Sequence, residues 1–388
     1  MVKKITYVSR TTIPSRSANS IHVMKMCDAL SQEGYKISLL TDPIIAKKMD
    51  SNEPEIIDDY KYYGARHHFK IIKLYYPWIK KVNGIIYSIY SFFWIKRRKT
   101  DLVFSRDLLT AFLCATYDYK VIYECHGISD SYFDIYILNK LIKYKKLNMF
   151  ISISNEMYKI LLHRYPEIIN INHLTAHDGV DLNQFGESVK KYEIRENLKY
   201  TKKDFVIGYT GSLMNGRGIE LIIDLAEKLQ DYKFFVAGGR EFEIEYYNEY
   251  KKRERINNIF FNGFIPNGKI VKYLSACDLL LMPYQKNLTS ASGIKINNTK
   301  WMSPMKMFEY MASGVPIVSS YFRVLEEVLH HNHNAYFVDP ENIDEWIHAI
   351  KQLHSDIKLR KKLSENARHD VTNYTWLNRA QRIIYNLK

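Results

Sequence analysis

Cysteine is scarce in this chain, which has four cysteines and no Cys-x-x-Cys pair. Cys27, Cys114, Cys125 and Cys277 each lie in an apolar segment. That pattern is typical of buried, reduced thiols rather than of a disulfide framework or a zinc site. We therefore expect a reduced, cytoplasmic protein.

Long apolar runs are also missing. No stretch reaches the roughly 20 apolar residues that a membrane-spanning helix needs. The first residues, MVKKITYVSR, have a strand pattern, and no long apolar stretch follows their lysines, so we expect no signal peptide. Repeats of solenoid length and low-complexity tracts are absent too.

Acidic residues are few relative to basic ones. The chain has 56 Lys and Arg against 42 Asp and Glu, a net charge of +14. This excess predicts an anionic partner: nucleic acid, an anionic membrane or a phosphorylated small molecule. The hydrophobic content of 46% is that of a globular protein, and 388 residues are too many for a single core. Two domains are therefore expected.

Strand patterns alternate with helical patterns along the chain, such as the helix expected from Ser20 to Gly34. The expected strands are KITYVS, KISLLT, DLVFS, KVIYE, MFISIS and INHLT, then FVIGYTG, YKFFVAG, IFFNGF, DLLLMPY and VPIVSS. This alternation predicts two doubly wound α/β domains with parallel sheets. The polar segment 183–203 suggests domains at 1–185 and 186–372, with a C-terminal helix, 373–388, packing back toward the first domain. Ligands of such sheets bind beyond the carboxyl ends of the strands, so the expected site is the cleft between the domains.

The first strand of the second domain runs into a glycine-rich turn, GYTGSLMNGRG, before a helix. Gly211 and Gly216 would let backbone N–H groups approach a phosphate at the helix N-terminus, and Arg217 would add a charge-assisted contact. Because the turn lacks Gly-x-Gly-x-x-Gly, a plain turn with a solvated arginine is an equally good interpretation.

A single acid, Glu309, lies in the otherwise apolar helical pattern SPMKMFEYMASG. Ser303 and Pro304 predict the start of this helix. Lys306 and Glu309 are three residues apart and share a helix face, which points toward the strand ends if the helix follows DLLLMPY. A surface Lys–Glu pair is the alternative.

An ordered set of motifs resembles family 4 of the retaining glycosyltransferases over nearly the whole chain. In the second half the motifs are GYTGSL, RGIELIIDLAEKL, FFVAGG, FFNGFIPNGKIVKYLSACDLLLMPY and SPMKMFEYMASGVPIVSSYFRVLEEVL. In the first half they are SRSANSIHVMKMCDALSQEGYKISLLT, VIYECHGI, FISISNEMYKILLHRYP and AHDGVDLNQF. The resemblance implies the GT-B fold, with two Rossmann-like domains, and a nucleotide diphosphate sugar, by family frequency UDP-linked, bound without a metal or other cofactor.

The resemblance also implies roles for residues of the second domain. Glu309 matches the second glutamate of the family's Glu-x7-Glu motif, which contacts the ribose, whereas Trp301 stands at the first position. Arg217 matches one of two basic diphosphate residues, and Ser212 stands at the other. Lys306 would contact the sugar or the diphosphate. The donor-binding candidates are Ser17, Ala18, Gly211, Ser212, Gly216, Arg217, Ser303, Pro304, Lys306 and Glu309.

In the first domain, Ser17 and Ala18 match small residues near the diphosphate, and His126 matches a histidine near the reacting sugar. His126, Arg217, Lys306 and Glu309 form the expected catalytic set. Arg106 and Glu124 are candidates for acceptor or sugar contacts, with an ion pair to Asp107 or another acid as the alternative for Arg106. Glu124 is expected to point away from His126, in a packing role. Asp178 and Gly179 are expected to form a turn.

A basic, aromatic segment spans residues 75–99, YYPWIKKVNGIIYSIYSFFWIKRRK. Its apolar centre is too short to cross a bilayer but suits a helix in the headgroup layer of an anionic membrane. Asn83, Ser88 and Ser91 fall on one side of that helix. A crossover helix packed on the sheet is the alternative. The expected membrane residues are Trp78, Lys80, Lys81, Phe92, Phe93, Trp94, Lys96, Arg97 and Arg98.

The leading hypothesis is a metal-independent, retaining hexosyltransferase that acts on a glycan or lipid-linked glycan in bacterial surface polysaccharide synthesis, at the inner face of the cytoplasmic membrane. One alternative is an inactive sugar-nucleotide-binding relative, because Trp301 replaces a motif glutamate. The other is a nucleic-acid-binding protein, which the charge suggests, but no recognition helix or zinc pattern accompanies that charge. We therefore expect no nucleic acid partner.

Overall fold

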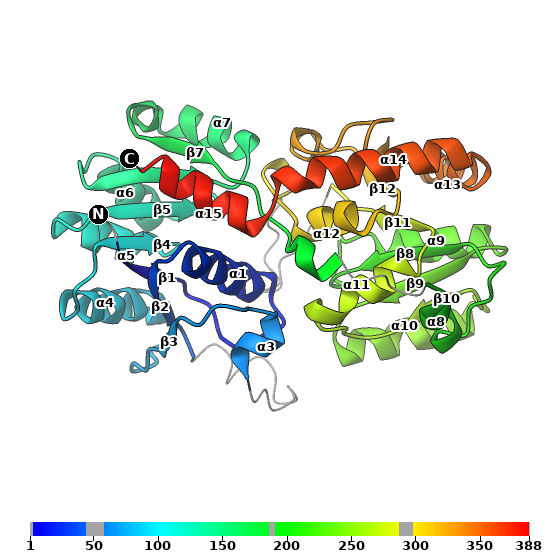
Figure 1. Ribbon diagram of the computed structural model, residues 1–388, viewed down its shortest axis with the longest axis horizontal. Helices are drawn as coiled ribbons and strands as arrows, with labels where there is room; N and C mark the ends of the chain where they lie inside the picture. Colours follow the sequence, from blue (N-terminus) through cyan, green and yellow to red (C-terminus); the bar gives the residue numbers. More distant parts are fainter. Residues whose placement is uncertain (1–2, 44–57, 186–190, 287–297, 388) are drawn as a thin grey trace. The chain divides into compact units, whose positions relative to one another are not determined.

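The computed structural model describes residues 3–43, 58–185, 191–286 and 298–387. Contacts between Cα atoms divide the chain into two units (Figure 1). Unit 1 comprises Met1–Asp178 and Trp376–Lys388, and unit 2 comprises Gly179–Thr375. The limits expected from the sequence, 185 and 372, lie close to these.

Unit 1 is built on a parallel sheet of seven strands in the order β3-β2-β1-β4-β5-β6-β7. The strands are β1 (Lys4–Val8), β2 (Lys36–Thr41), β3 (Lys70–Lys73), β4 (Leu102–Ser105), β5 (Val121–Cys125), β6 (Leu147–Ser152) and β7 (His173–Thr175). The central strands read as continuous apolar runs because helices cover both faces of the sheet. Strand β3, which has four residues and lies at the edge of the sheet, was not predicted from the sequence.

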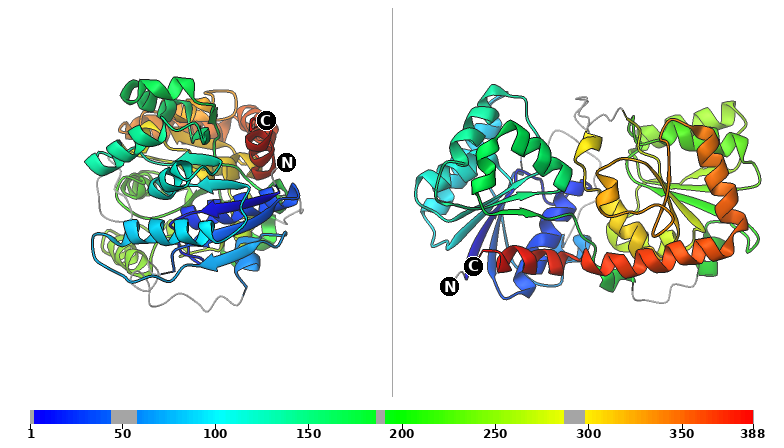
Figure 2. Two further views of the ribbon diagram at one scale, coloured as in Figure 1. Left: turned by 90° about the vertical axis from the view of Figure 1, so that its left-hand side faces the viewer. Right: turned by 90° about the horizontal axis from the view of Figure 1, so that it is seen from above.

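Helices α4, α5 and α6 cover one face of this sheet, and α1 and α15 lie side by side on the other (Figure 2). The helices of unit 1 are α1 (Ala18–Gln32), α3 (Asp59–Tyr63), α4 (Asn83–Lys96), α5 (Leu108–Thr116), α6 (Tyr132–Leu141), α7 (Asn155–Arg164) and α15 (Trp376–Tyr385). The first of them begins at Ala18, two residues before the expected start, because the side chain of Ser17 caps it by accepting from the Ser20 N–H.

Unit 2 has a parallel sheet of six strands in the order β10-β9-β8-β11-β12-β13. The strands are β8 (Val206–Thr210), β9 (Lys233–Ala237), β10 (Ile259–Phe261), β11 (Leu279–Met282), β12 (Ile317–Ser320) and β13 (Tyr336–Val338). The helices are α8 (Lys191–Asn197), α9 (Ile219–Lys228), α10 (Glu241–Arg253), α11 (Asn267–Ser275), α12 (Met305–Ser313), α13 (Ile343–Ser355) and α14 (Ile357–Asp370). Strand β13, an edge strand of three residues, was not predicted from the sequence.

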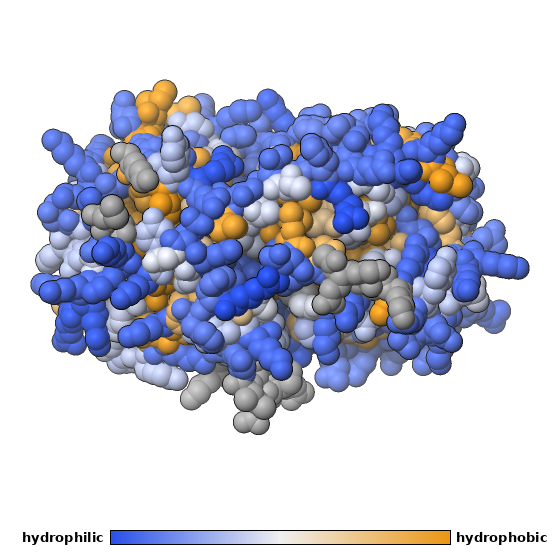
Figure 3. Space-filling view, viewed as in Figure 1, coloured by the Kyte–Doolittle hydropathy of each residue, from blue (hydrophilic) through white to orange (hydrophobic). Residues whose placement is uncertain are grey.

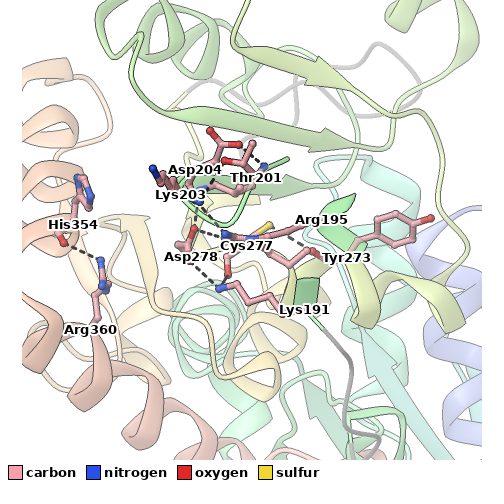
Figure 4. A network of polar contacts seen from close by, with 12 residues as sticks. Lys191, Arg195, Thr201, Lys203, Asp204, Tyr273, Cys277, Asp278, His354 and Arg360 are labelled. Carbon is pink, nitrogen blue, oxygen red and sulfur yellow. Dashed lines mark hydrogen bonds and ion pairs between the residues drawn. The ribbon is translucent and has the colours of Figure 1, made fainter. Parts of the chain in front are cut away.

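A polar network fastens α8 to the sheet of unit 2 (Figure 4). Asp278, which precedes β11, pairs with Arg195 and, at 2.8 Å, with Lys191, and it accepts the backbone N–H of Val206 at 2.8 Å. The Arg195 Nε donates to the Ala276 carbonyl at 2.8 Å. The network lies where β8 and β11 begin, so it stabilises the end of the sheet away from the loops that follow the strands.

Both sheets reverse their winding at the first strand of the unit. Strand β1 lies between β2 and β4, and β8 lies between β9 and β11. At such a reversal the loops after the two central strands lead to opposite faces and leave a crevice for ligands. Most candidate residues follow these central strands, whereas Glu124 lies in β5, which is next to β4 in the sheet, and His126 follows β5. The expected doubly wound α/β fold is therefore confirmed.

Candidate functional site

Lys306 lies at the strand ends of unit 2, between two aromatic rings. It is the second residue of α12, and its Nζ lies 4.1 Å from the ring centroid of Tyr209 and 5.2 Å from that of Tyr284. The Arg217 guanidinium lies 5.5 Å from the same Tyr284 ring. Cations are attracted to the faces of aromatic rings, so the two tyrosines hold two positive charges close together.

Glycine is required where the chain leaves β8. Gly211 has a φ of +144°, and a Cβ there would lie 2.6 Å from the Lys306 Nζ. Gly238, which follows β9, has a φ of +121°, and its Cβ would lie 1.9 Å from the Gly211 carbonyl oxygen. The backbones at the ends of β8 and β9 therefore touch, and the Lys306 Nζ lies beside the first of them.

The turn that carries Arg217 is tied to the end of β11. The Gln285 N–H donates to the Gly216 carbonyl at 3.0 Å, and Gly218 packs against Pro283 so closely that a Cβ would lie 2.0 Å from its carbonyl oxygen. Gly218 caps α9 with a φ of +83°. The Nε of Arg217 is buried and has no hydrogen-bond partner in the described part of the chain. This turn fixes the arginine beside a helix N-terminus, which favours anions.

The charges in this cluster act on one another. Burial lowers the pKa of Lys306 well below its usual value, the charge of Arg217 lowers it further, and Glu309 acts in the opposite direction. Glu309 follows on the next turn of α12 and is partly exposed. An anion bound here would favour the charged lysine. The cluster of Arg217, Lys306 and Glu309, which we call the unit 2 cluster, is thus suited to binding a diphosphate.

The remaining unit 2 candidates frame this cluster. The carbonyl of Ser212 accepts from the Tyr209 hydroxyl at 2.8 Å, so this residue fixes the ring below the lysine. Ser303 is buried, and Pro304 is the residue at the N-cap position of α12. Trp301, at the position of the missing motif glutamate, is partly buried.

In unit 1, Glu124 is the centre of a buried polar cluster. One of its oxygens, Oε1, contacts His126 and lies 3.0 Å from His22 Nε2 and 3.6 Å from Arg106 Nε. The other, Oε2, lies 3.1 Å from Arg379 Nη2, on α15. Burial raises the pKa of Glu124, but the charge of Arg379 and the contacts that His126 and His22 make with the carboxylate outweigh burial and hold the pKa well below its usual range.

This geometry corrects one prediction. We expected Glu124 to point away from His126, but the two side chains touch. Residues two apart on a strand share a face, so the expectation misapplied the strand period. The ion pair of Arg106 goes to Glu124, whereas Asp107 caps α5.

His126 is held neutral at ordinary pH. Burial lowers its pKa to about 3, the charge of Arg106 contributes, and Glu124 opposes the shift. Its side chain is still one quarter exposed, so it can touch a ligand. His22 is in turn oriented by Asp178, whose Oδ1 lies 2.8 Å from its Nδ1.

His126 lines a pocket of about 370 Å³ whose walls all belong to unit 1. The walls are formed by Ser9, Arg10, Ala18, Asn19, His22, Arg106, His126 and Asp178. Ser17 and Ala18 are exposed at the N-terminus of α1. We call this space the unit 1 pocket.

Three residues of the polar cluster around Glu124 have the donor atoms of a metal site. Ligand atoms of His22, Glu124 and His126 lie within 4.8 Å of one another. However, Arg106 and Arg379 pair with the same carboxylate. Since these fixed positive charges would repel a divalent cation, the cluster fits an ion-paired carboxylate better than a metal centre.

Several residues of the unit 2 cluster and of the polar cluster around Glu124 were not predicted from the sequence. Tyr209 and Tyr284 lie in or beside buried strands and look like ordinary core residues. His22 and Arg379 come from helices at opposite ends of the chain, and no local motif marks either. Asp178 was expected to form only a turn, yet it orients a histidine.

The four cysteines are buried and free, as expected. Among the described residues, none of the helices has the length and apolar character to cross a membrane.

Comparison with known proteins finds a family match in the C-terminal half of the chain. Residues 190–370 match the family described as Glycosyl transferases group 1. An uncharacterized glycosyltransferase of Methanocaldococcus jannaschii is 25% identical over 201 residues, 50% of this chain and 47% of that protein. Spore coat protein SA of Bacillus subtilis is 21% identical over 285 residues, 66% of this chain and 71% of that protein. The chain thus spans about half the length of the first of these relatives.

Solved structures match over the full length. Sucrose-phosphate synthase from Thermosynechococcus elongatus has a TM-score of 0.75 at 15% identity and covers 99% of this chain and 98% of its own. HepE of Anabaena, in complex with UDP and glucose, has a TM-score of 0.73 at 16% identity and covers 100% and 99%. The GT-B fold is confirmed, and the resemblance holds at the level of group 1 glycosyl transferases.

Proposed function

We propose that this chain, which combines the GT-B fold with a group 1 glycosyl transferase domain, transfers a hexose from a UDP-sugar to a glycan or lipid-linked glycan. The observation that carries the proposal is the unit 2 cluster, in which Arg217, Lys306 and Glu309 lie together beside strand ends and helix N-termini. HepE of the same fold has been solved with UDP, which supports the choice of nucleotide. Bacterial surface polysaccharide synthesis is the proposed setting.

The unit 2 cluster supplies the electrostatics that such a reaction needs. Negative charge grows on the diphosphate as the bond to the sugar breaks, and Arg217 and Lys306 are placed to stabilise it. Glu309 is suited to the ribose hydroxyls. In unit 1 the neutral His126 can donate or accept a hydrogen bond to the sugar. We propose a retaining, metal-independent reaction, because these fixed cations take the part that a metal ion would otherwise play.

Calorimetric titration with UDP tests the donor site. We expect Arg217→Met and Lys306→Met each to weaken UDP binding about tenfold or more, since a charge-assisted hydrogen bond contributes about 1.5–3 kcal/mol. Lys300→Met is the matched control because Lys300 is exposed. Unchanged UDP affinity in both variants would refute the assignment.

A second candidate is a sugar-nucleotide-binding protein without transferase activity. Trp301 favours it, because this residue replaces the glutamate expected to hold the donor sugar. The two candidates differ in turnover. Release of UDP from UDP-glucose in the presence of a glycan acceptor, with the anomeric configuration of the product read by NMR, supports the enzyme. Tight UDP binding without turnover of any UDP-sugar supports the binding protein.

We also propose that α4 rests on an anionic membrane, at the inner face of the cytoplasmic membrane. Its buried side carries Ser88 and Ser91, and the Ser88 hydroxyl donates to Asp107 at 2.7 Å. Its outward side carries Ile85, Ile89 and Phe93, the last 49% exposed. The buried side also carries Tyr87, Phe92 and Ile95, so this helix is apolar on both sides, whereas the outward side of an ordinary surface helix is polar.

The surroundings of α4 suit lipid headgroups. Exposed apolar residues continue before the helix at Trp78, Ile79 and Val82. Exposed cations flank it at Lys80, Lys81, Lys96, Arg97, Arg98 and Lys99. Elsewhere, the face seen in Figure 3 is largely hydrophilic, with apolar side chains in small patches. Cations beside exposed aromatic and aliphatic side chains match the interface of an anionic bilayer.

Two of the predicted membrane residues, Phe92 and Trp94, are wholly or partly buried. Phe92 is 5% exposed and packs against Tyr117, so its predicted contact with lipid is wrong. It belongs to the side of α4 that holds the helix on the sheet. Trp94 is only partly buried, and the Arg98 guanidinium lies 5.5 Å from its ring.

Vesicle co-sedimentation tests the membrane proposal. Vesicles with phosphatidylglycerol should retain the protein at low salt and release it at high salt, because screening weakens the contacts of exposed charges. The double variant Ile89→Ser/Phe93→Ser should reduce binding strongly. Ile357→Ser, at an exposed apolar residue of unit 2, is the control. Equal binding of both variants would refute the role of α4.

A further inference from the structure

We infer that the unit 1 pocket binds an anionic group of the acceptor, a phosphate or a carboxylate, through Arg10, Arg106 and the N-terminus of α1. Only the identification of the anion as part of the acceptor rests on the proposed function. The anion site itself depends only on the pocket.

Arg106 provides the first observation. Its side chain is 10% exposed and lines the pocket. Its Nε faces Glu124 Oε1 at 3.6 Å, whereas its Nη1 is buried without a hydrogen-bond partner in the described ranges. A buried guanidinium N–H that nothing accepts is costly, and an anion in the pocket would satisfy it.

Arg10 provides the second observation in favour of an anion site. It follows β1, lines the same pocket and is 38% exposed. Its Nε lies 3.6 Å from the Asp42 carboxylate, which the Tyr76 hydroxyl also holds at 2.6 Å. On its other side the guanidinium rests on Gly84, where a Cβ would lie 2.5 Å from Nη1. The arginine is therefore positioned from two sides at the mouth of the pocket.

The start of α1 completes the anion site. Ala18 and Asn19, in the first turn of this 15-residue helix, line the pocket. The N–H groups of a first turn have no partners within the helix, and the helix dipole favours negative charge there. Two guanidinium groups and a helix N-terminus thus converge on one space.

The acidic groups around the pocket are already engaged. Asp178 lines it but pairs with His22, Asp42 faces Arg10, and Glu124 is fully buried among its partners. The anion would lie beside His126, the proposed sugar contact, which also lines the pocket. The cations proposed for the donor diphosphate belong to the unit 2 cluster. A second anion site next to the reacting sugar therefore fits the acceptor, and Ala18, predicted from the resemblance to lie near the donor diphosphate, is here assigned to the acceptor instead.

Titration of the full-length chain with inorganic phosphate, followed by thermal shift, tests the inference. We expect Arg10→Gln and Arg106→Gln each to weaken phosphate binding about tenfold or more. Gly84→Ala keeps both charges but displaces the Arg10 guanidinium, so it should weaken phosphate binding as well. Arg97→Gln, at an exposed arginine, is the matched control. UDP affinity should stay within about twofold of wild type in all four variants.

Two competition arms distinguish the source of the anion. Glucose 1-phosphate represents a water-soluble acceptor, and monomeric short-chain phosphatidic acid represents a lipid one. Displacement of phosphate by either compound supports the inference and identifies the source. The inference is overturned if neither compound competes, or if Arg10→Gln and Gly84→Ala bind phosphate as wild type does. It is also overturned if UDP displaces phosphate and loses affinity in Arg10→Gln, because the site would then hold the donor. Failure of wild type to bind UDP while phosphate still binds would refute only the proposed function.

Discussion

The contact between Arg379 and Glu124 gives the sharpest test of how unit 1 is held together. Arg379 is 4% exposed and lies on α15. It pairs with Glu124 Oε2 at 3.1 Å and donates to the carbonyls of His177 at 2.9 Å and Ala176 at 3.2 Å. Arg379→Met keeps the length of the side chain but leaves a buried carboxylate and two carbonyls with fewer partners.

The expected loss of stability is large. Removing one partner of a buried ion pair costs about 3–5 kcal/mol. We expect about 3 kcal/mol here, because His22, His126 and Arg106 still face Glu124. For a unit of this size 1 kcal/mol shifts Tm by about 2–4 °C, so the transition of unit 1 should fall by about 6–12 °C.

Differential scanning calorimetry is the assay, because a chain with two units can show two transitions. The control is Arg382→Met, since Arg382 is exposed on the same helix and donates one hydrogen bond of 3.3 Å to the Thr175 carbonyl. Its effect should stay within about 0.5 kcal/mol. Adding Glu124→Gln to Arg379→Met should recover part of the loss, because the two residues are coupled. Equal effects of the two single arginine variants, or strict additivity in the double variant, would refute the reasoning.

Four further predictions concern pH and packing. Because the pKa of His126 is lowered from 6.5 to about 3, the unfolded state binds the extra proton between these values. The free energy of unfolding, measured by urea titration, should therefore decrease as the pH is lowered through that window. The decrease should be steeper than in His126→Gln by up to about 1.4 kcal/mol per pH unit. Protonation of Glu124 should add a further loss of stability as the pH is lowered below the usual carboxyl value of 4.5. Burial and the charge of Arg217 lower the pKa of Lys306, so at pH values above this lowered pKa the binding of UDP should take up a proton at Lys306. UDP affinity should then fall as pH rises, and calorimetry in buffers of different ionisation enthalpy measures the uptake. Asp278→Asn should cost about 2–3 kcal/mol by urea titration, because it breaks the pair with the buried Arg195, against about 0.5 kcal/mol or less for Glu341→Gln in an exposed pair. Gly238→Ala should cost more than about 2 kcal/mol, since its Cβ meets a carbonyl oxygen, whereas Gly268→Ala, with open space in a helix, should stabilise by about 0.5–1 kcal/mol.

The sequence predicted most of the fold because the central strands are buried on both faces. Strands such as β1, β5 and β8 are continuous apolar runs that stand out between helical patterns. The two strands it missed, β3 and β13, have four and three residues and lie at sheet edges. An edge strand is covered less completely, so its composition is less distinctive.

The candidate site was predicted unevenly for a similar reason. Arg217, Lys306 and Glu309 were found because they lie in a glycine-rich turn and a helical segment whose motifs resemble those of a known family. Their aromatic supports were not, because a tyrosine at a strand end resembles a core residue. The cluster around Glu124 joins residues separated by most of the chain, and only tertiary structure brings Arg379 to it. Local patterns contain no information on such contacts.

The division of unit 1 between the two ends of the chain has a consequence for biosynthesis. Helix α15 packs beside α1, yet the whole of unit 2 is translated between them. A nascent chain can complete the sheet of unit 1 early, but Glu124 then lacks its ion-pair partner Arg379 until α15 has been synthesised. Unit 2 can therefore finish folding before unit 1, because α15 can pack against α1 only after α15 has left the ribosomal exit tunnel.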